Sequence, residues 1–178
     1  NPNHTGKEDY NYFLTVAFPA DQLKILPYNR AVRTLNHHTP ATFLTLIGEK
    51  FRISPAEDGE VAHSGEFKFY LAHEWYLARP KFDLSKLNVI EQLDVSILQD
   101  NVLAPLLGID DPRTSREIDF IGGIRGTQEL IRLVDSKEYA IAFSMHATTV
   151  DQLMAIADAG EIMPPKSTWF EPKLRDGL

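Results

Sequence analysis

The 178-residue sequence contains no cysteine. This absence excludes disulfide bonds, zinc sites with thiolate ligands and thiol nucleophiles, and it is typical of a reducing compartment, so we expect a cytoplasmic location. Every stretch of fifteen residues contains a charge or a proline, so the sequence predicts no membrane span. The first residues, NPNHTGKEDYNYF, lack the basic and apolar segments of a signal peptide. We expect them to form a loop that follows an upstream domain.

Positive charge is also scarce. The chain has 18 Lys and Arg residues against 25 Asp and Glu residues, and its net charge is -7. Such a balance repels a phosphate backbone unless the cations cluster on one face. The composition therefore disfavours nucleic acid as a partner, and with it a DNA-binding regulator.

The remaining composition is that of an ordinary globular protein, with 43% hydrophobic and 24% charged residues. This length suits one hydrophobic core. We expect residues 1–178 to form a single C-terminal domain of a longer protein, with two sub-lobes over 1–110 and 111–178 as the alternative.

Strands and one hairpin are expected to dominate the first lobe. Alternating patterns rich in β-branched and aromatic residues predict strands over 10–20, 24–33 and 51–54, and a hairpin over 66–80. Thr39 followed by Pro40 is a typical helix start, and the apolar residues behind it predict a helix to about residue 51. A second helix is expected to begin at Asp94 or Ser96, and Pro105 is expected to kink or end it.

The last third alternates between the two element types. Strands are predicted over 117–123 and 139–147, and helices over 127–137 and 148–160. Thr149 and Gln152 have the spacing of a capping box. Such alternation predicts a βαβα unit with parallel strands, so the fold class is α+β: mixed sheets, an N-terminal strand and hairpin lobe, and a C-terminal βαβα unit.

Two familiar motifs are not supported by their context. GEIMPPKS has the spacing of a P-loop, but Pro165 replaces the second glycine and two prolines remove the backbone donors that hold phosphate. No pair of histidines has the HExxH spacing, because Leu77 stands where the second ligand would be, so no metal site is predicted.

Three segments carry candidate anion-binding groups. The GGIRG run precedes a predicted helix start, where Arg125 either binds an anion with Thr127 or stays solvated. In PYNR, Asn29 and Arg30 follow a strand, and the arginine either binds phosphate or carboxylate or pairs with an acid. The tail MPPKSTWFEPKL is stiffened by prolines and offers cations and hydroxyls. Its candidate phosphate ligands are Lys166, Ser167, Thr168 and Lys173. The alternative is that Trp169 and Phe170 anchor a closing strand while the lysines are solvated.

The phrases FPADQLKILPYNRAVR, LDVSILQ and, above all, GEIMPPKSTWFEPKLRDGL resemble an uncharacterised bacterial and archaeal family, domain of unknown function 1015. The resemblance covers most of the chain. It implies a full-length protein about twice as long, with an upstream Ala-Asp-Gly-His-His-Arg-Tyr motif that is similar to the Asp-Gly-His-x-Arg signature of ParB and sulfiredoxin-like proteins. That group includes kinases that phosphorylate free serine.

The resemblance implies the C-terminal half of a nucleotide-dependent phosphotransferase for a small molecule such as an amino acid, with ATP or ADP and Mg in the full-length protein. The tail cations would bind phosphate, since phosphoryl transfer depends on positioned cations and donors. The fragment alone is expected to be inactive, because the catalytic motif is absent from it. The alternative is a non-catalytic domain that packs on the upstream domain or on a second copy of itself as a homodimer.

Overall fold

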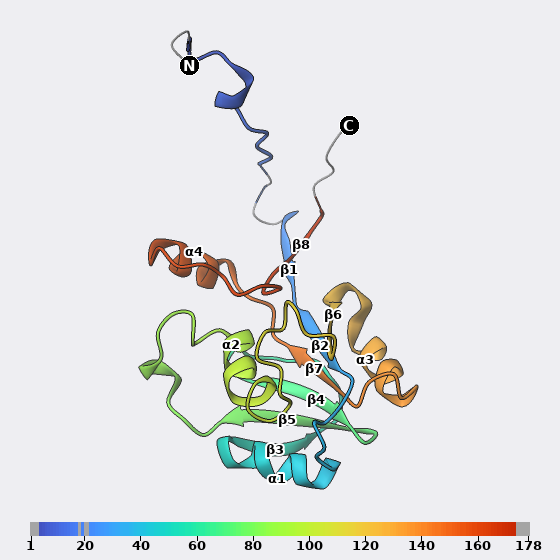
Figure 1. The fold of residues 1–178 in the computed structure, drawn as a ribbon. Helices are drawn as coiled ribbons and strands as arrows, with labels where there is room; N and C mark the ends of the chain where they lie inside the picture. Colours follow the sequence, from blue (N-terminus) through green and yellow to red (C-terminus); the bar gives the residue numbers. More distant parts are fainter. Residues whose placement is uncertain (1–3, 18, 20–21, 174–178) are drawn as a thin grey trace.

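The computed structural model describes residues 4–17, 19 and 22–173 (Figure 1). The fold is α+β, with a six-stranded and a two-stranded sheet. The α-helices are α1 (Pro40–Lys50), α2 (Asp94–Leu98), α3 (Gly126–Asp135) and α4 (Val150–Asp158). The strands are β1 (Lys24–Leu26), β2 (Tyr28–Val32), β3 (Phe51–Ala56), β4 (Phe67–Leu71), β5 (Glu74–Pro80), β6 (Ile118–Gly122), β7 (Ile141–Met145) and β8 (Trp169–Glu171). Shorter helical turns are η1 (Asp9–Asn11), η3 (Leu84–Lys86), η4 (Gln99–Leu103) and η5 (Gly123–Arg125).

The large sheet has the order β3-β5-β4-β7-β2-β6. Neighbouring strands are antiparallel throughout. The sheet therefore combines strands from residues 1–110 with strands from residues 111–178. The small sheet pairs β1 with β8, so the tail returns to the segment that precedes β2.

The predicted order of strand, helix, strand, helix in the last third is confirmed as β6, α3, β7 and α4. However, β6 and β7 do not pair with each other, because β2 lies between them and is antiparallel to both. They therefore run in the same direction on either side of a strand from the first lobe, as in a split βαβ unit. Periodicity within a segment reveals strands but not which distant strand separates them.

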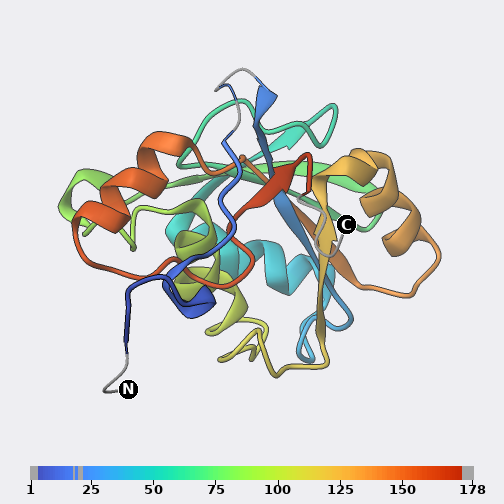
Figure 2. The ribbon, with the colours of Figure 1, turned by 90° about the horizontal axis from the view of Figure 1, so that it is seen from above.

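Two layers of side chains cover the large sheet. On one face, Leu130, Leu133 and Val134 of α3 pack against Tyr70 and Trp75. On the other face lies the main core, which combines α1, α2, η4 and Ile156 of α4 with Phe67, Phe69 and Phe143 of the sheet. Figures 1 and 2 show α3 apart from the other helices, in agreement with this division.

Local sequence signals explain several boundaries. The Thr39 side chain accepts a hydrogen bond from the Thr42 N–H, and Pro40 occupies the first helical position of α1. Thr149 and Gln152 form the predicted capping box of α4. The hairpin between β4 and β5 turns at Ala72 and His73, which both have positive φ angles, as a tight two-residue turn requires.

The predicted strand over 10–20 is wrong within the described residues. The segment begins with the turn η1, and residues 12–17 form neither helix nor strand. Its large apolar side chains are exposed, with Phe13 at 87% and Leu14 at 79%. An alternating pattern forms a strand only where a neighbouring strand accepts its hydrogen bonds, and none of the described residues does so. In Figure 1 this segment runs away from the body of the fold.

Candidate functional site

The loop before β8 covers a buried arginine of β2. Arg30 is 4% exposed, and its guanidinium donates hydrogen bonds to the carbonyl of Tyr28 and, at 3.2 Å, to the carbonyl of Lys166. Its Cζ lies 5.5 Å from the centre of the Phe120 ring, within cation–π range. Burial lowers the pKa of Arg30 to about 10, while the charge of Asp94 opposes this shift, so the side chain stays protonated at neutral pH.

Arg30 forms no ion pair with any carboxylate of the described residues, although buried charges are usually paired. Two of its N–H groups reach main-chain carbonyls, and a guanidinium carries further donors. The side chain also lines a cavity. Arg30 therefore holds the tail in place and still has donors for a ligand.

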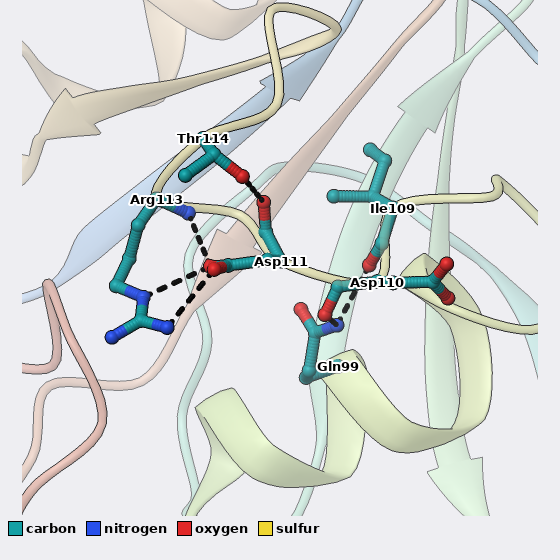
Figure 3. Close-up of polar contacts among 6 residues, drawn as sticks. All are labelled: Gln99, Ile109, Asp110, Asp111, Arg113 and Thr114. Carbon is teal, nitrogen blue, oxygen red and sulfur yellow. Dashed lines mark hydrogen bonds and ion pairs between the residues drawn. The ribbon is translucent and has the colours of Figure 1, made fainter.

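The cavity beside Arg30 has a volume of about 410 Å³ and lies between α2, η4, the segment 110–113 and the tail prolines. Charges of both signs line it, among them Asp100, Asp110, Asp111 and Arg113. Asp111 and Arg113 satisfy each other, because Nε and Nη2 of the arginine each lie 2.9 Å from a carboxylate oxygen (Figure 3). The charges left for a ligand are thus the cation of Arg30 and the carboxylates of Asp100 and Asp110.

Main-chain contacts hold the acidic segment on η4. The Gln99 Nε2 donates to the carbonyls of Ile109 at 2.8 Å and of Asp110 at 3.3 Å. Figure 3 shows the Asp110 side chain pointing away from the Asp111–Arg113 pair. No lysine or arginine of the described residues pairs with this carboxylate, so the loop backbone sets its position.

A second cavity, of about 550 Å³, lies further along the tail, where residues 168–170 line it. It is largely apolar and aromatic, and Tyr28 and Trp169 contribute rings whose centres are 5.2 Å apart. The Nζ of Lys173 lies 3.7 Å from the centre of the Trp169 ring, and the Nζ of Lys166 lies 5.5 Å from that of Tyr28. Thr168 also lines this cavity. Two cations and one hydroxyl thus surround an aromatic surface.

The other sequence candidates occupy different surroundings. Ser167 is 4% exposed, and its hydroxyl donates to the Pro164 carbonyl at 2.6 Å. This hydrogen bond joins two residues of the tail and stabilises its conformation. Asn29, the neighbour of Arg30 in β2, points to the opposite face of the sheet, where it lines a third cavity. Arg125 is exposed in η5 and lies 3.7 Å from a carboxylate oxygen of Glu129. The structure therefore brings Arg30 to the tail, where Lys166, Thr168 and Lys173 lie. It does not bring Asn29 or Arg125 there.

Sequence reasoning missed the acidic side of the Arg30 cavity. The segment IDDPRT has the composition of a polar loop. It is far from Arg30 in the sequence, so the sequence does not show that both line one cavity. It also missed Asp94, which it treated only as a helix start. This carboxyl is buried, and burial raises its pKa to about 6 although the Gly65 N–H and the Ser64 hydroxyl donate to it. The sequence signal for a buried carboxyl was the position of Asp94 within the apolar run LDVSIL.

Among the described residues, no three His, Cys, Asp or Glu side chains lie close enough together to bind a metal ion. No helix in the described part of the chain is long and apolar enough to cross a membrane.

Residues 1–96 match the family described as "Protein of unknown function (DUF1015)", which is more than half of the chain. The chain belongs to this family. The matched residues include β2 with Arg30 and the start of α2 with Asp94. Part of the lining of the Arg30 cavity therefore lies within the matched residues. No protein with a curated description matches the chain.

Solved structures share the fold at low identity. A mutant free serine kinase in complex with AMP is 16% identical, with a TM-score of 0.50 over 85% of this chain and 55% of that one. A conserved hypothetical protein from Pyrococcus furiosus is 17% identical, with a TM-score of 0.50 over 84% and 56%. A mutant free serine kinase in complex with ADP is 21% identical, with a TM-score of 0.47 over 85% and 55%. The chain therefore spans little more than half the length of these structures, and at such identities the likeness is one of fold.

Proposed function

We propose that the chain is part of a nucleotide-dependent phosphotransferase that acts on a small zwitterion such as an amino acid. The observation that carries this proposal is Arg30, a buried cation without a carboxylate partner among the described residues, which lines a cavity that also holds Asp100 and Asp110. The carboxylate of an amino acid would accept hydrogen bonds from Arg30. Its ammonium group would bind Asp100 or Asp110, which line the same cavity.

The second cavity suits the nucleotide. A flat base can stack on Tyr28 or Trp169, while Lys166, Lys173 and Thr168 offer charge and hydrogen bonds to phosphate groups. Because the Arg30 guanidinium bonds to the Lys166 carbonyl, a phosphate held at Lys166 would lie near the cavity proposed for the acceptor. The fold that the chain shares with a free serine kinase in complex with AMP supports this assignment.

The reaction would need groups beyond these residues. The family resemblance places an Asp-Gly-His-x-Arg type motif outside this sequence, and phosphoryl transfer also needs a group that orients the attacking hydroxyl. We therefore expect the isolated 178-residue chain to bind ligands but not to turn them over, and activity is to be sought in the whole protein.

Conversion of nucleotide in the presence of an amino acid tests this function. The whole protein is incubated with ATP or ADP, with and without hydroxyl-bearing amino acids, and ³¹P NMR follows the appearance of a new phosphomonoester. We expect Arg30→Gln to weaken amino-acid binding at least about tenfold, because it removes a charge-assisted hydrogen bond. Arg30→Lys keeps the charge and should lie in between.

Arg33 provides the matched control. It is an exposed arginine just after β2 that pairs with Asp119, so Arg33→Gln removes a cation of the same type without touching the cavity. Equal amino-acid affinity in the Arg30 and Arg33 variants would overturn the assignment of Arg30. The absence of both a new phosphomonoester and a thermal shift with any nucleotide would overturn the phosphotransferase proposal.

The second candidate is a non-catalytic interaction domain. The exposed apolar residues Tyr10, Tyr12, Phe13 and Leu14 favour it, because such a segment gains stability by packing on another surface. The same titrations separate the two proposals, since an interaction domain responds to neither nucleotide nor amino acid. The partner would then be the remainder of the protein, or a second copy of the chain.

A further inference from the structure

A third cavity, of about 290 Å³, opens on the face of the sheet opposite Arg30, at the start of α3. It is lined by Asn29 of β2, Ser144 at the end of β7, His146 just beyond it, and Gly126 and Thr127 of α3. Successive residues of a strand point to opposite faces of a sheet. This cavity is therefore separate from the one that Arg30 lines.

The helix start provides backbone donors. α3 spans ten residues, and no side chain caps its N-terminus. The Gly126 N–H bonds to the Gly123 carbonyl, and Gly126 itself has a φ of 68°, which turns the chain into the helix. The next N–H groups, of Thr127 and Gln128, lie in the first turn and have no partner within the helix. Such groups, aligned with the helix dipole, attract anions.

Buried side chains give the second, independent indication. Ser144 is 3% exposed, and its hydroxyl forms no hydrogen bond with any described residue. Asn29 is 2% exposed; its Oδ1 accepts from the Met145 N–H at 3.0 Å, whereas its Nδ2 donates to no described residue. The Nδ1 of His146 is buried without a partner. Buried polar groups are nearly always hydrogen-bonded. The buried Nδ1 of His146, together with the Asn29 and Ser144 groups that line the same cavity without a described partner, therefore indicates a missing ligand.

The chemistry of these groups selects the ligand. The Asn29 amide, the Ser144 hydroxyl and the backbone N–H groups are donors, and the His146 Nδ1 becomes one in the appropriate tautomer. The one lining carboxylate among the described residues is Glu60, which is exposed. We propose that this cavity binds a tetrahedral oxyanion, either free phosphate or the phosphate group of a small phosphomonoester.

Calorimetric titration of the whole protein with inorganic phosphate, and separately with AMP, tests the site. We expect Ser144→Ala to weaken binding about tenfold or more, because it removes a donor to a charged ligand. Thr127→Pro removes one backbone donor in the first turn of α3, where the N–H has no partner within the helix, and should act in the same direction. Binding of phosphate alone identifies a free-phosphate site, whereas binding of AMP alone, with the same sensitivity to Ser144, identifies a phosphomonoester site.

Two controls keep the outcome specific. Ser136→Ala removes a hydroxyl at the opposite end of α3, where it donates to the Leu133 carbonyl, and should leave the affinity unchanged. Arg33→Gln should also leave it unchanged, because this exposed arginine pairs with Asp119 and lines neither this cavity nor the two cavities of the proposed function. The ligand-free melting temperature of Ser144→Ala should stay equal or rise, because the lost hydroxyl is unsatisfied. Unchanged affinity in Ser144→Ala, or no binding of either anion by the wild type, overturns the proposal.

Discussion

The carboxyl group of Asp94 lies at the start of α2, where burial raises its pKa from 3.8 to about 6. A folded-state pKa above the unfolded value means that the folded state binds more protons between about pH 4 and pH 6, so this group's contribution to stability falls as the pH rises through that window. At about 1.36 kcal/mol per pH unit, ionised Asp94 costs the folded state about 3 kcal/mol at neutral pH.

We therefore expect Asp94→Asn to gain stability relative to wild type by about 3 kcal/mol between about pH 4 and pH 7. Urea unfolding at several pH values measures the difference. Asp58→Asn is the control, because this exposed carboxylate bonds to Lys68 and its pKa is lowered, so its effect should have the opposite sign. A difference that does not depend on pH would contradict the prediction.

Among the elements, α1 and α4 begin with the same type of cap but differ in how much they bury. The Thr39 and Thr149 hydroxyls each accept a hydrogen bond from a first-turn N–H. α1 packs Phe43 and Ile47 into the core, whereas α4 buries only Ile156. Loss of a threonine cap costs about 1 kcal/mol of helix stability.

Thr39→Ala should accordingly lower the free energy of unfolding of the whole molecule by about 1 kcal/mol. Thr149→Ala should mainly increase hydrogen exchange within α4, because a helix with so few core contacts can open without unfolding the sheet. Chemical denaturation and exchange mass spectrometry distinguish the two effects. Equal loss of global stability in both variants would show that α4 is coupled to the core as tightly as α1.

The elements that were predicted correctly are those that carry their own signals. The cap at Thr39, the hairpin of β4 and β5, and the capping box of α4 depend on neighbouring residues, which the sequence places side by side. The strand expected over 10–20 has the right periodicity but no described partner strand. The insertion of β2 between β6 and β7 depends on contacts between distant segments, so periodicity did not reveal it.

At the level of the whole molecule, the candidate site also depends on contacts between distant segments, which the sequence alone does not predict. Residue type singled out Arg30 and Lys166 as possible anion ligands, but their meeting at the Lys166 carbonyl is a contact across 136 positions. The carboxylates of the cavity come from yet another segment. Residue types within one stretch can be recognised in a sequence, whereas the combination of Arg30 with Asp100 and Asp110 around one cavity depends on the fold.

The large sheet mixes strands from both parts of the chain, so we expect the molecule to unfold as one unit. β2 from the first part of the chain lies between β6 and β7 from the last part, and β7 also pairs with β4. Phe143 of β7 is fully buried and its ring contacts those of Phe67 and Phe69 in β4. Phe143→Ala should therefore destabilise both parts of the chain together, by about 3–5 kcal/mol.

Fluorescence and circular dichroism during urea unfolding measure this coupling, because Trp75 lies in β5 and Trp169 in β8. A Trp75→Phe and a Trp169→Phe variant each leave one reporter, and we expect both reporters and the far-ultraviolet signal to give one coincident transition, shifted equally by Phe143→Ala. Separate transitions would instead indicate two lobes, over 1–110 and 111–178, that unfold independently. Interdigitated strands argue against that outcome, since removing either part leaves the other with unpaired strand edges and an exposed aromatic core.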